Sequence, residues 1–341
     1  MDYTFAQVAR SLALAQGDIA NAKLRAAASY GTRSRAYEYL TKAEAISTGS
    51  ISGDGLPVAF GGFAGFVSAI RATSIIGRLE EALPASFQRT LPYTPLLAEG
   101  STASAGWTAE LQLKNVTGDT FVATRMVPKK CSGTIVITDE FGKQVGDAAN
   151  AWITRNLSRA VTTKLNTTFA SDEPASDASP GGIFQGITAL PSSGDAADDL
   201  FALLDSFPGN LDTSAIICTP SVAARLAVDW STVGVAGGFA SGVVVVTSSD
   251  LSAGFMGIAD LSGIELWMGP VEPSATGESI ITIETDSGSQ GLPLWQSNLL
   301  ALRAEQFCAW QRLRDDAVRW IADASGVRKA DAPKVKARAA A

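Results

Sequence analysis

The spacing of hydrophobic residues changes several times along the chain, and each change predicts a different element. From Asp139 to Phe169 apolar residues recur every three or four positions, with few helix breakers between them. About thirty residues at 1.5 Å per residue would form a helix roughly 45 Å long. This segment is therefore predicted to be the long spine of the fold.

The first 46 residues also show helical spacing. Tyr3 to Ile46 is rich in alanine, with leucines and aromatics on a helical repeat, and predicts one or two helices. From Ser47 to Gly65 six glycines surround Pro57, which is the composition of a linker. We therefore expect the N-terminal helices to form a separable arm.

Between Leu91 and Ile137 most residues are β-formers. Trp107–Leu113 and Phe121–Val127 flank a turn that contains Asn115 and Gly118, which predicts a long two-stranded hairpin with little core of its own. Because an isolated hairpin is marginally stable in water, we expect this one to pack on a neighbouring subunit.

The second half mixes helices and strands after a turn-rich loop at Ser171–Gly186. Two helices are predicted, at 195–207 and 220–228. The basic, alanine-rich end from Gly326 has the composition of a disordered tail, with contact to DNA as the alternative. The predicted strands are 215–218, 243–247, 263–268, 279–285, 299–304 and 317–321.

Composition favours a protein that associates with copies of itself. Hydrophobic residues make up 46% and charged residues 18%, so some of the surface must be apolar. The net charge of −7 excludes an overall basic surface for nucleic acid. No long apolar stretch or basic leader occurs, so we expect a soluble cytoplasmic product with no membrane segment.

Candidate chemistry is sparse. The chain has no histidine, which removes the commonest general base and transition-metal ligand. Cys131, Cys218 and Cys308 fit neither a disulfide framework nor a zinc site. Gly61–Gly65 lacks the Gly-Lys-Ser/Thr ending of a phosphate-binding loop and is interpreted as a hinge. We therefore predict no catalytic, metal or cofactor site.

Three stretches, in this order, resemble the tailed-phage major capsid family of the Hong Kong 97-like type. Gly106 to Phe141, through Pro128-Lys129-Lys130, is similar to the family's extended loop and its entry into the spine helix. Pro180 to Ile187 resembles the loop that opens the axial domain. Asn298 to Glu305, followed by residues 315–321, is similar to the closing strands of the peripheral domain.

The resemblance implies an α+β fold with an N-terminal helical arm, an extended β-hairpin loop, a long spine helix, and peripheral and axial domains. The arm would be a scaffolding-like segment, which some family members remove by proteolysis. The boundaries are then 1–50 for the arm, 51–90 for a flexible linker and N-arm, 91–138 for the hairpin loop, 139–185 for the peripheral domain with the spine helix, 186–295 for the axial domain, 296–325 for the closing strands and 326–341 for the basic tail.

The implied function is that of a non-enzymatic major capsid protein. Pentamers and hexamers of one chain would form an icosahedral head around double-stranded DNA, without sequence-specific binding, in the cytoplasm of a bacterial host. Portal, scaffold, maturation protease and decoration proteins are the further partners that the family implies. The predicted subunit-interface residues are Trp107, Glu110, Lys129, Lys130, Arg303 and Glu305.

Some interpretations stay open on the sequence. Lys129-Lys130 is either a cross-linking or salt-bridging site, as the loop lysines of some family members are, or a pair of solvated lysines. A shell of the same fold could instead be a bacterial nanocompartment that holds an enzyme. A soluble enzyme or ligand-binding protein would need a pocket with converging polar groups.

Overall fold

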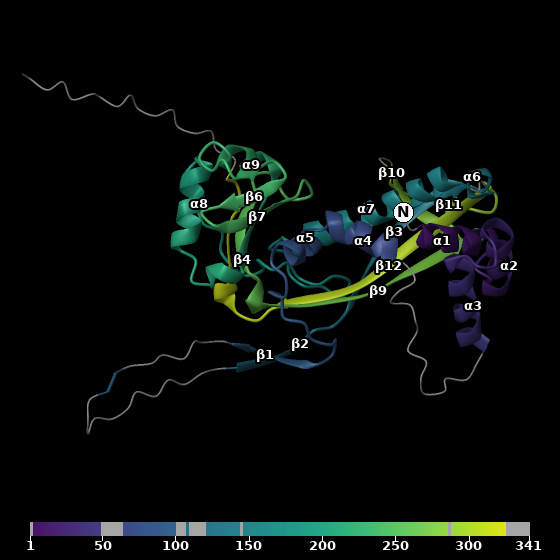
Figure 1. The fold of residues 1–341 in the computed structure, drawn as a ribbon, viewed down its shortest axis with the longest axis horizontal. Coiled ribbons are helices and arrows are strands. Elements are labelled where there is room, and N and C mark those ends of the chain that lie inside the picture. The colour runs from purple at the N-terminus through teal and green to yellow at the C-terminus, as the bar shows by residue number, and fades with distance from the viewer. Residues whose placement is uncertain are drawn as a thin grey trace, which may run out of the picture.

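The computed structural model describes residues 3–48, 64–99, 107–108, 121–143, 146–285 and 288–324. Figure 1 shows two lobes connected by long strands. One lobe is built on a three-stranded sheet covered by helices, and the other on a six-stranded sheet. We call them the three-stranded lobe and the six-stranded lobe.

The three-stranded sheet has the order β3-β12-β9 and is antiparallel. Its strands are β3 (Lys129–Thr138), β12 (Leu299–Arg312) and β9 (Ile264–Thr276). β12 and β9 run well past the predicted segments 299–304 and 263–268. Their length lets them pass out of the sheet to the six-stranded lobe (Figure 1).

The predicted spine helix is interrupted, so the prediction of one continuous helix from 139 to 169 was wrong. A short helix, α6 (Asp139–Lys143), precedes α7 (Asp147–Phe169), which begins after an extended residue, Gly146. The 23 residues of α7 extend about 35 Å rather than 45 Å. The side chain of Arg10 explains part of the break, because it donates to the carbonyl of Gly142 and so satisfies the end of α6.

The N-terminal helices are part of the core rather than a separable arm. Phe5 and Val8 are fully buried in the same hydrophobic cluster as the apolar face of α7. The ring of Phe5 stacks on Phe66 at 4.0 Å between centroids. Composition correctly predicted a helical segment, but three helices form where one or two were expected, and composition could not show which surface covers them. The helices in this region are α1 (Thr4–Leu14), α2 (Ile19–Tyr30) and α3 (Arg35–Thr48).

A flexible linker over 51–90 is also contradicted where the structure describes it. Two helices, α4 (Ala64–Thr73) and α5 (Ile75–Ala82), occupy much of its second half. Ile75 and Leu79 are completely buried. The glycines before α4, including Gly61, lie outside the described residues.

The predicted hairpin loop is described only at its base. There β1 (Pro95–Glu99) pairs with β2 (Phe121–Arg125), with Pro95 opposite Arg125 and Glu99 opposite Phe121. Most of the predicted strand 107–113 lies outside the described residues. A second hairpin, β10 (Ile280–Thr285) and β11 (Gly288–Pro293), extends from the other end of β9.

The six-stranded sheet has the order β13-β8-β4-β7-β6-β5, in which only the β4–β7 pair is parallel. Helices α8 (Ala196–Asp205) and α9 (Pro220–Leu226) complete this lobe, which has a hydrophobic cluster of its own. The predicted mixture of helices and sheets is confirmed. The strands are β4 (Ser214–Cys218), β5 (Val233–Gly234), β6 (Gly237–Ala240), β7 (Val243–Thr247), β8 (Met256–Asp260) and β13 (Val318–Ile321).

Candidate subunit contacts and the junction between the lobes

Three of the predicted interface residues meet on one face of the three-stranded sheet. The Nζ atom of Lys130 lies 3.2 Å from Oε2 of Glu305, and Nε of Arg303 lies 3.2 Å from Oε1. Glu305 is directly opposite Glu272 on β9, a pairing of like charges that is unfavourable by itself. Lys130 and Arg303 offset this repulsion, so the ion pairs of Glu305 stabilise the sheet within one subunit.

Lys129 and Lys130 are both engaged inside the chain. Nζ of Lys129 donates to the carbonyl of Asp177 at 3.0 Å, in the loop after α7. Nζ of Lys130 lies 5.3 Å above the ring of Phe307. The salt-bridging interpretation thus describes an intrachain contact of Lys130, and covalent cross-linking stays a prediction.

The other two predicted residues lie on the hairpin. Trp107 is fully exposed, and Glu110 is outside the described residues. At the base of the hairpin Leu91, Tyr93 and Val127 are also exposed. A large apolar side chain in water at each of these places is typical of a surface that another molecule covers.

Further exposed hydrophobic residues lie at other extremities of the molecule. Ile280 and Trp295 lie at or beside the β10–β11 hairpin, and each is more than 70% exposed. Trp152 lies at the surface of α7 with 38% of its area exposed. In the six-stranded lobe the exposed residues are Phe201, Leu211, Val228, Val235 and Phe239.

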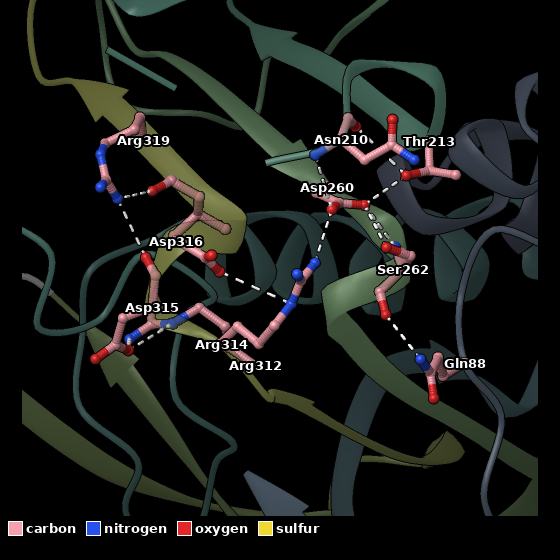
Figure 2. Close-up of polar contacts among 11 residues, drawn as sticks. Gln88, Asn210, Thr213, Asp260, Ser262, Arg312, Arg314, Asp315, Asp316 and Arg319 are labelled. Carbon is pink, nitrogen blue, oxygen red and sulfur yellow. Dashed lines mark hydrogen bonds and ion pairs between the residues drawn. The ribbon is translucent and has the colours of Figure 1, made fainter. Parts of the chain in front are cut away.

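Three chain crossings join the lobes, and a buried carboxylate connects two of them. Asp260 ends β8 just before the chain enters β9, and Arg314 follows β12 just before β13. Figure 2 shows Nη2 of Arg314 pointing at the Asp260 carboxylate, 2.9 Å from Oδ2. The side chain of Asp260 is completely buried.

Asp260 accepts four more hydrogen bonds from the six-stranded lobe and the turn after β8. Thr213 donates at 2.6 Å, Ser262 donates from its hydroxyl at 2.7 Å and from its backbone at 3.0 Å, and the Asn210 backbone donates at 3.2 Å. Burial alone would raise the pKa of Asp260, but these hydrogen bonds outweigh it and the pKa is lowered. The carboxylate is therefore held ionised at the junction.

Arg312 makes a second connection at the same place. Its Nη1 donates to the carbonyls of Ile183, at 2.5 Å, and Gln185, at 2.9 Å, in the loop that follows α7. Its Nη2 lies 2.6 Å from Asp315 (Figure 2). Together Arg312 and Arg314 fix the orientation of the six-stranded lobe relative to α7 and the three-stranded sheet.

The long helix contributes a third connection, which the sequence reasoning missed. Oδ1 of Asn166 accepts from the backbone of Ile75 at 2.8 Å, and Nδ2 donates to Asp250 at 2.8 Å. Asn166 ends a buried polar stripe on α7 that faces α4 and α1, with one member every four residues. The four-residue spacing of these polar positions is a signal in the sequence, because it places them on one face of the helix. The stripe is Asn150, Thr154, Ser158, Thr162 and Asn166.

No arrangement for acid–base or nucleophilic chemistry occurs in the described part of the chain. Burial raises the pKa of Cys218 and of Cys308 to about 12, and also raises that of half-buried Cys131, so these thiols are poor nucleophiles. The described residues hold no group of three or more potential metal ligands of the Cys, Asp or Glu type. No described helix is long and apolar enough to cross a membrane.

A cavity of about 230 Å³ lies between α4–α5 and β9. Its charged residues are Arg71, Glu80 and Arg89, and both arginines form ion pairs with Glu80. Paired in this way, they stabilise the packing of the helices. The one carboxylate of the lining, Glu80, is thus already held by two cations.

Comparisons with known proteins find similarity to phage capsid proteins. The model of the phage capsid family matches residues 64–228. The capsid polyprotein of Pseudomonas phage PAJU2 is 27% identical over 309 residues, which is 82% of this chain and 46% of that protein. The chain thus spans about half the length of this curated relative.

One solved structure shares the fold at low sequence identity, and a second aligns less closely. A chain of Mycobacterium phage Ogopogo overlaps with a TM-score of 0.50 and 15% identity, over 74% of this chain and 92% of that one. A chain from the capsid of a native GTA particle overlaps with a TM-score of 0.48 and 9% identity, over 70% and 88%.

Proposed function

We propose that this chain is the major capsid protein of a tailed phage and assembles through pentamers and hexamers into an icosahedral head. The observation that carries the proposal is the family match over 64–228, which covers α4, α5, the hairpin base, α7 and much of the six-stranded lobe. The predicted α+β, Hong Kong 97-like fold is confirmed by the structure and its neighbours.

The distribution of exposed apolar residues supports assembly. They occur on the hairpin, on α7, beside β10–β11 and across the six-stranded lobe, so one chain offers several contact surfaces. Permanent complexes bury about 2,000 to 5,000 Å² per interface. A subunit that meets several neighbours needs such patches on many sides, whereas a monomeric enzyme does not.

Trp107 and Glu110 remain our proposed contacts of the hairpin with a neighbouring subunit. The exposed base of the hairpin, at Leu91, Tyr93 and Val127, extends that surface toward the sheet. Lys129, Lys130, Arg303 and Glu305, which also make contacts within the subunit, remain proposed interface residues. In this proposal they stiffen β3 and β12, from which the hairpin projects.

The shell would enclose double-stranded DNA without reading its sequence, and it would form in the cytoplasm of a bacterial host. Portal, scaffold or maturation protease, and decoration proteins are the partners we propose. The burial of α1 argues that the N-terminal helices stay with the subunit, since their removal would expose the core around Phe5 and Val8. The boundaries of the hairpin loop, the peripheral and axial domains, the closing strands and the basic tail are proposals.

The protein is proposed to act by assembly and not by catalysis. The nanocompartment alternative is not favoured, because the curated relative is a phage capsid polyprotein. A soluble enzyme is opposed by the absence, in the described chain, of converging catalytic groups.

Light scattering of the purified full-length protein over a range of concentrations tests the proposal. We expect rings or shells of high mass above a threshold concentration, as cooperative assembly requires. A particle with the mass of one chain at every concentration, also when co-expressed with scaffold or protease partners, would contradict it.

A further inference from the structure

The net charge of −7 is concentrated in one part of the chain. Residues 186–260 contain eight Asp, no Glu and a single basic residue, Arg225. The remaining residues contain 26 acidic and 26 basic side chains. This segment supplies five strands of the six-stranded sheet together with α8 and α9, so that lobe is acidic while the rest of the chain is balanced.

The outer face of α8 presents part of this charge beside an aromatic ring. Asp198, Phe201, Ala202 and Asp205 are exposed and follow the spacing of one helix face. Phe201 is 56% exposed, and its ring lies 5.4 Å from that of Trp230, which holds it in place. Neither carboxylate has a partner among the described residues. We call these four residues the α8 patch.

The outer face of α7 has the same spacing and the opposite charge. Trp152, Arg155, Asn156 and Arg159 form this α7 patch, in which all but half-buried Asn156 are exposed. The ring of Trp152 meets Phe141 edge-on at 5.4 Å, so this aromatic is also held in place. The side chains of Arg155 and Arg159 make no hydrogen bond or ion pair with other described residues.

We propose that the α8 patch of one copy binds the α7 patch of a neighbouring copy. The inference rests on the proposed function and adds a specific contact to it. Guanidinium groups pair with carboxylates and stack on aromatic rings, so Arg155 and Arg159 suit both the acidic residues and Phe201.

The dimensions of the patches are compatible. At 1.5 Å per residue the two carboxylates of α8 lie about 10 Å apart along the helix, and the two arginines of α7 about 6 Å apart. Long arginine side chains span that difference while their stems cover apolar surface. Trp152 and Phe201 then supply the desolvated centre that strong interfaces have.

The placement of the patches makes the contact directional. In Figure 1 α8 lies on the far side of the six-stranded lobe from α7, so the two patches of one chain face different neighbours. Such a contact is heterologous, and repetition of it around a rotation axis closes a ring. DNA would bind the basic α7 patch but be repelled by the α8 patch, so the second copy is the occupant that explains both.

Charge reversal in the full-length chain tests the proposal. The basic variant is Arg155→Glu with Arg159→Glu, the acidic variant is Asp198→Lys with Asp205→Lys, and the third carries all four changes. We expect each double variant to form shells or rings with a yield at least about tenfold lower, because like charges then face each other. The combined variant should recover most of the yield.

The control is Asp172→Lys with Glu173→Lys, an equal change of charge in the exposed loop after α7. It should assemble like the unaltered chain. Two results would overturn the interface. One is equal assembly yield for all variants. The other is a combined variant that assembles no better than either double variant, although all variants have the same melting temperature. Failure of the unaltered chain to assemble would instead overturn the proposed function, and this inference with it.

A cross-link provides a measurement that does not depend on reversed charges. Asn156→Cys and Ala202→Cys place one thiol in each patch, and mild oxidation should give a ladder of linked chains on a non-reducing gel. Each single variant should give no ladder beyond dimers. Absence of the ladder in assembled particles of the double variant would also refute the contact.

Discussion

At the scale of single residues, Asp260 has the largest structural role. It accepts five hydrogen bonds, including one from Arg314, inside the junction of the two lobes (Figure 2). Asp260→Asn should lower the free energy of unfolding by about 2 to 4 kcal/mol, because Arg314 loses its buried counter-charge and an amide cannot accept all the bonds. Urea denaturation measures this. Exposed Asp212→Asn is the control, with an expected change below about 0.5 kcal/mol.

The same carboxylate predicts a dependence on pH. Its pKa is lower in the folded protein than in the unfolded chain, so its stabilising contribution is present above the unfolded value of about 3.9 and is lost as pH falls through the folded value. The stability difference between the native chain and Asp260→Asn should therefore be constant from pH 7 to about 5 and shrink below about 4. If the stability difference between the native chain and Asp260→Asn instead grew as the pH fell, the pKa of Asp260 would be raised by folding and not lowered.

At the scale of elements, the buried polar stripe of α7 positions the helices around it. Asn166 connects α5 to the loop after β7 through Ile75 and Asp250. Asn166→Leu should cost about 2 to 3 kcal/mol, since it leaves the buried backbone N–H of Ile75 without its acceptor and removes one of the hydrogen bonds to Asp250. Thermal unfolding of the full chain tests this against Asn156→Ala, which loses only a bond to its own helix. Equal melting temperatures would contradict this role of Asn166.

Elements were predicted from the sequence where local pattern determines them. Val243–Thr247 is a strand with the predicted bounds, and α7 lies inside the predicted spine. The break before Asp147 depends in part on Arg10, more than 130 residues away, and no local pattern reveals that contact. The contact between Lys130 and Glu305 likewise requires the β3–β12 register, which no local pattern reveals.

At the scale of the whole molecule, the subunit is two lobes fixed to each other by polar contacts, with apolar residues exposed on many sides. Among the predicted interface residues, Lys130, Arg303 and Glu305 contact one another inside one chain and Trp107 faces solvent, while their contact with a neighbouring subunit stays a prediction. Burial of α1 could not be inferred from its alanine-rich composition, since the surface that covers α1 comes from α7 and the three-stranded sheet. A subunit whose lobes are held by polar contacts and whose surface exposes several apolar patches suits a shell of many copies.

The most direct test of the account is electron microscopy of particles formed by the purified full-length chain. The account predicts closed hollow shells, or rings of five and six subunits, whose density fits the two lobes and the projecting hairpin. Dispersed single subunits at high concentration, with no ring or shell even beside scaffold or protease partners, would contradict the claim that this chain builds a phage head.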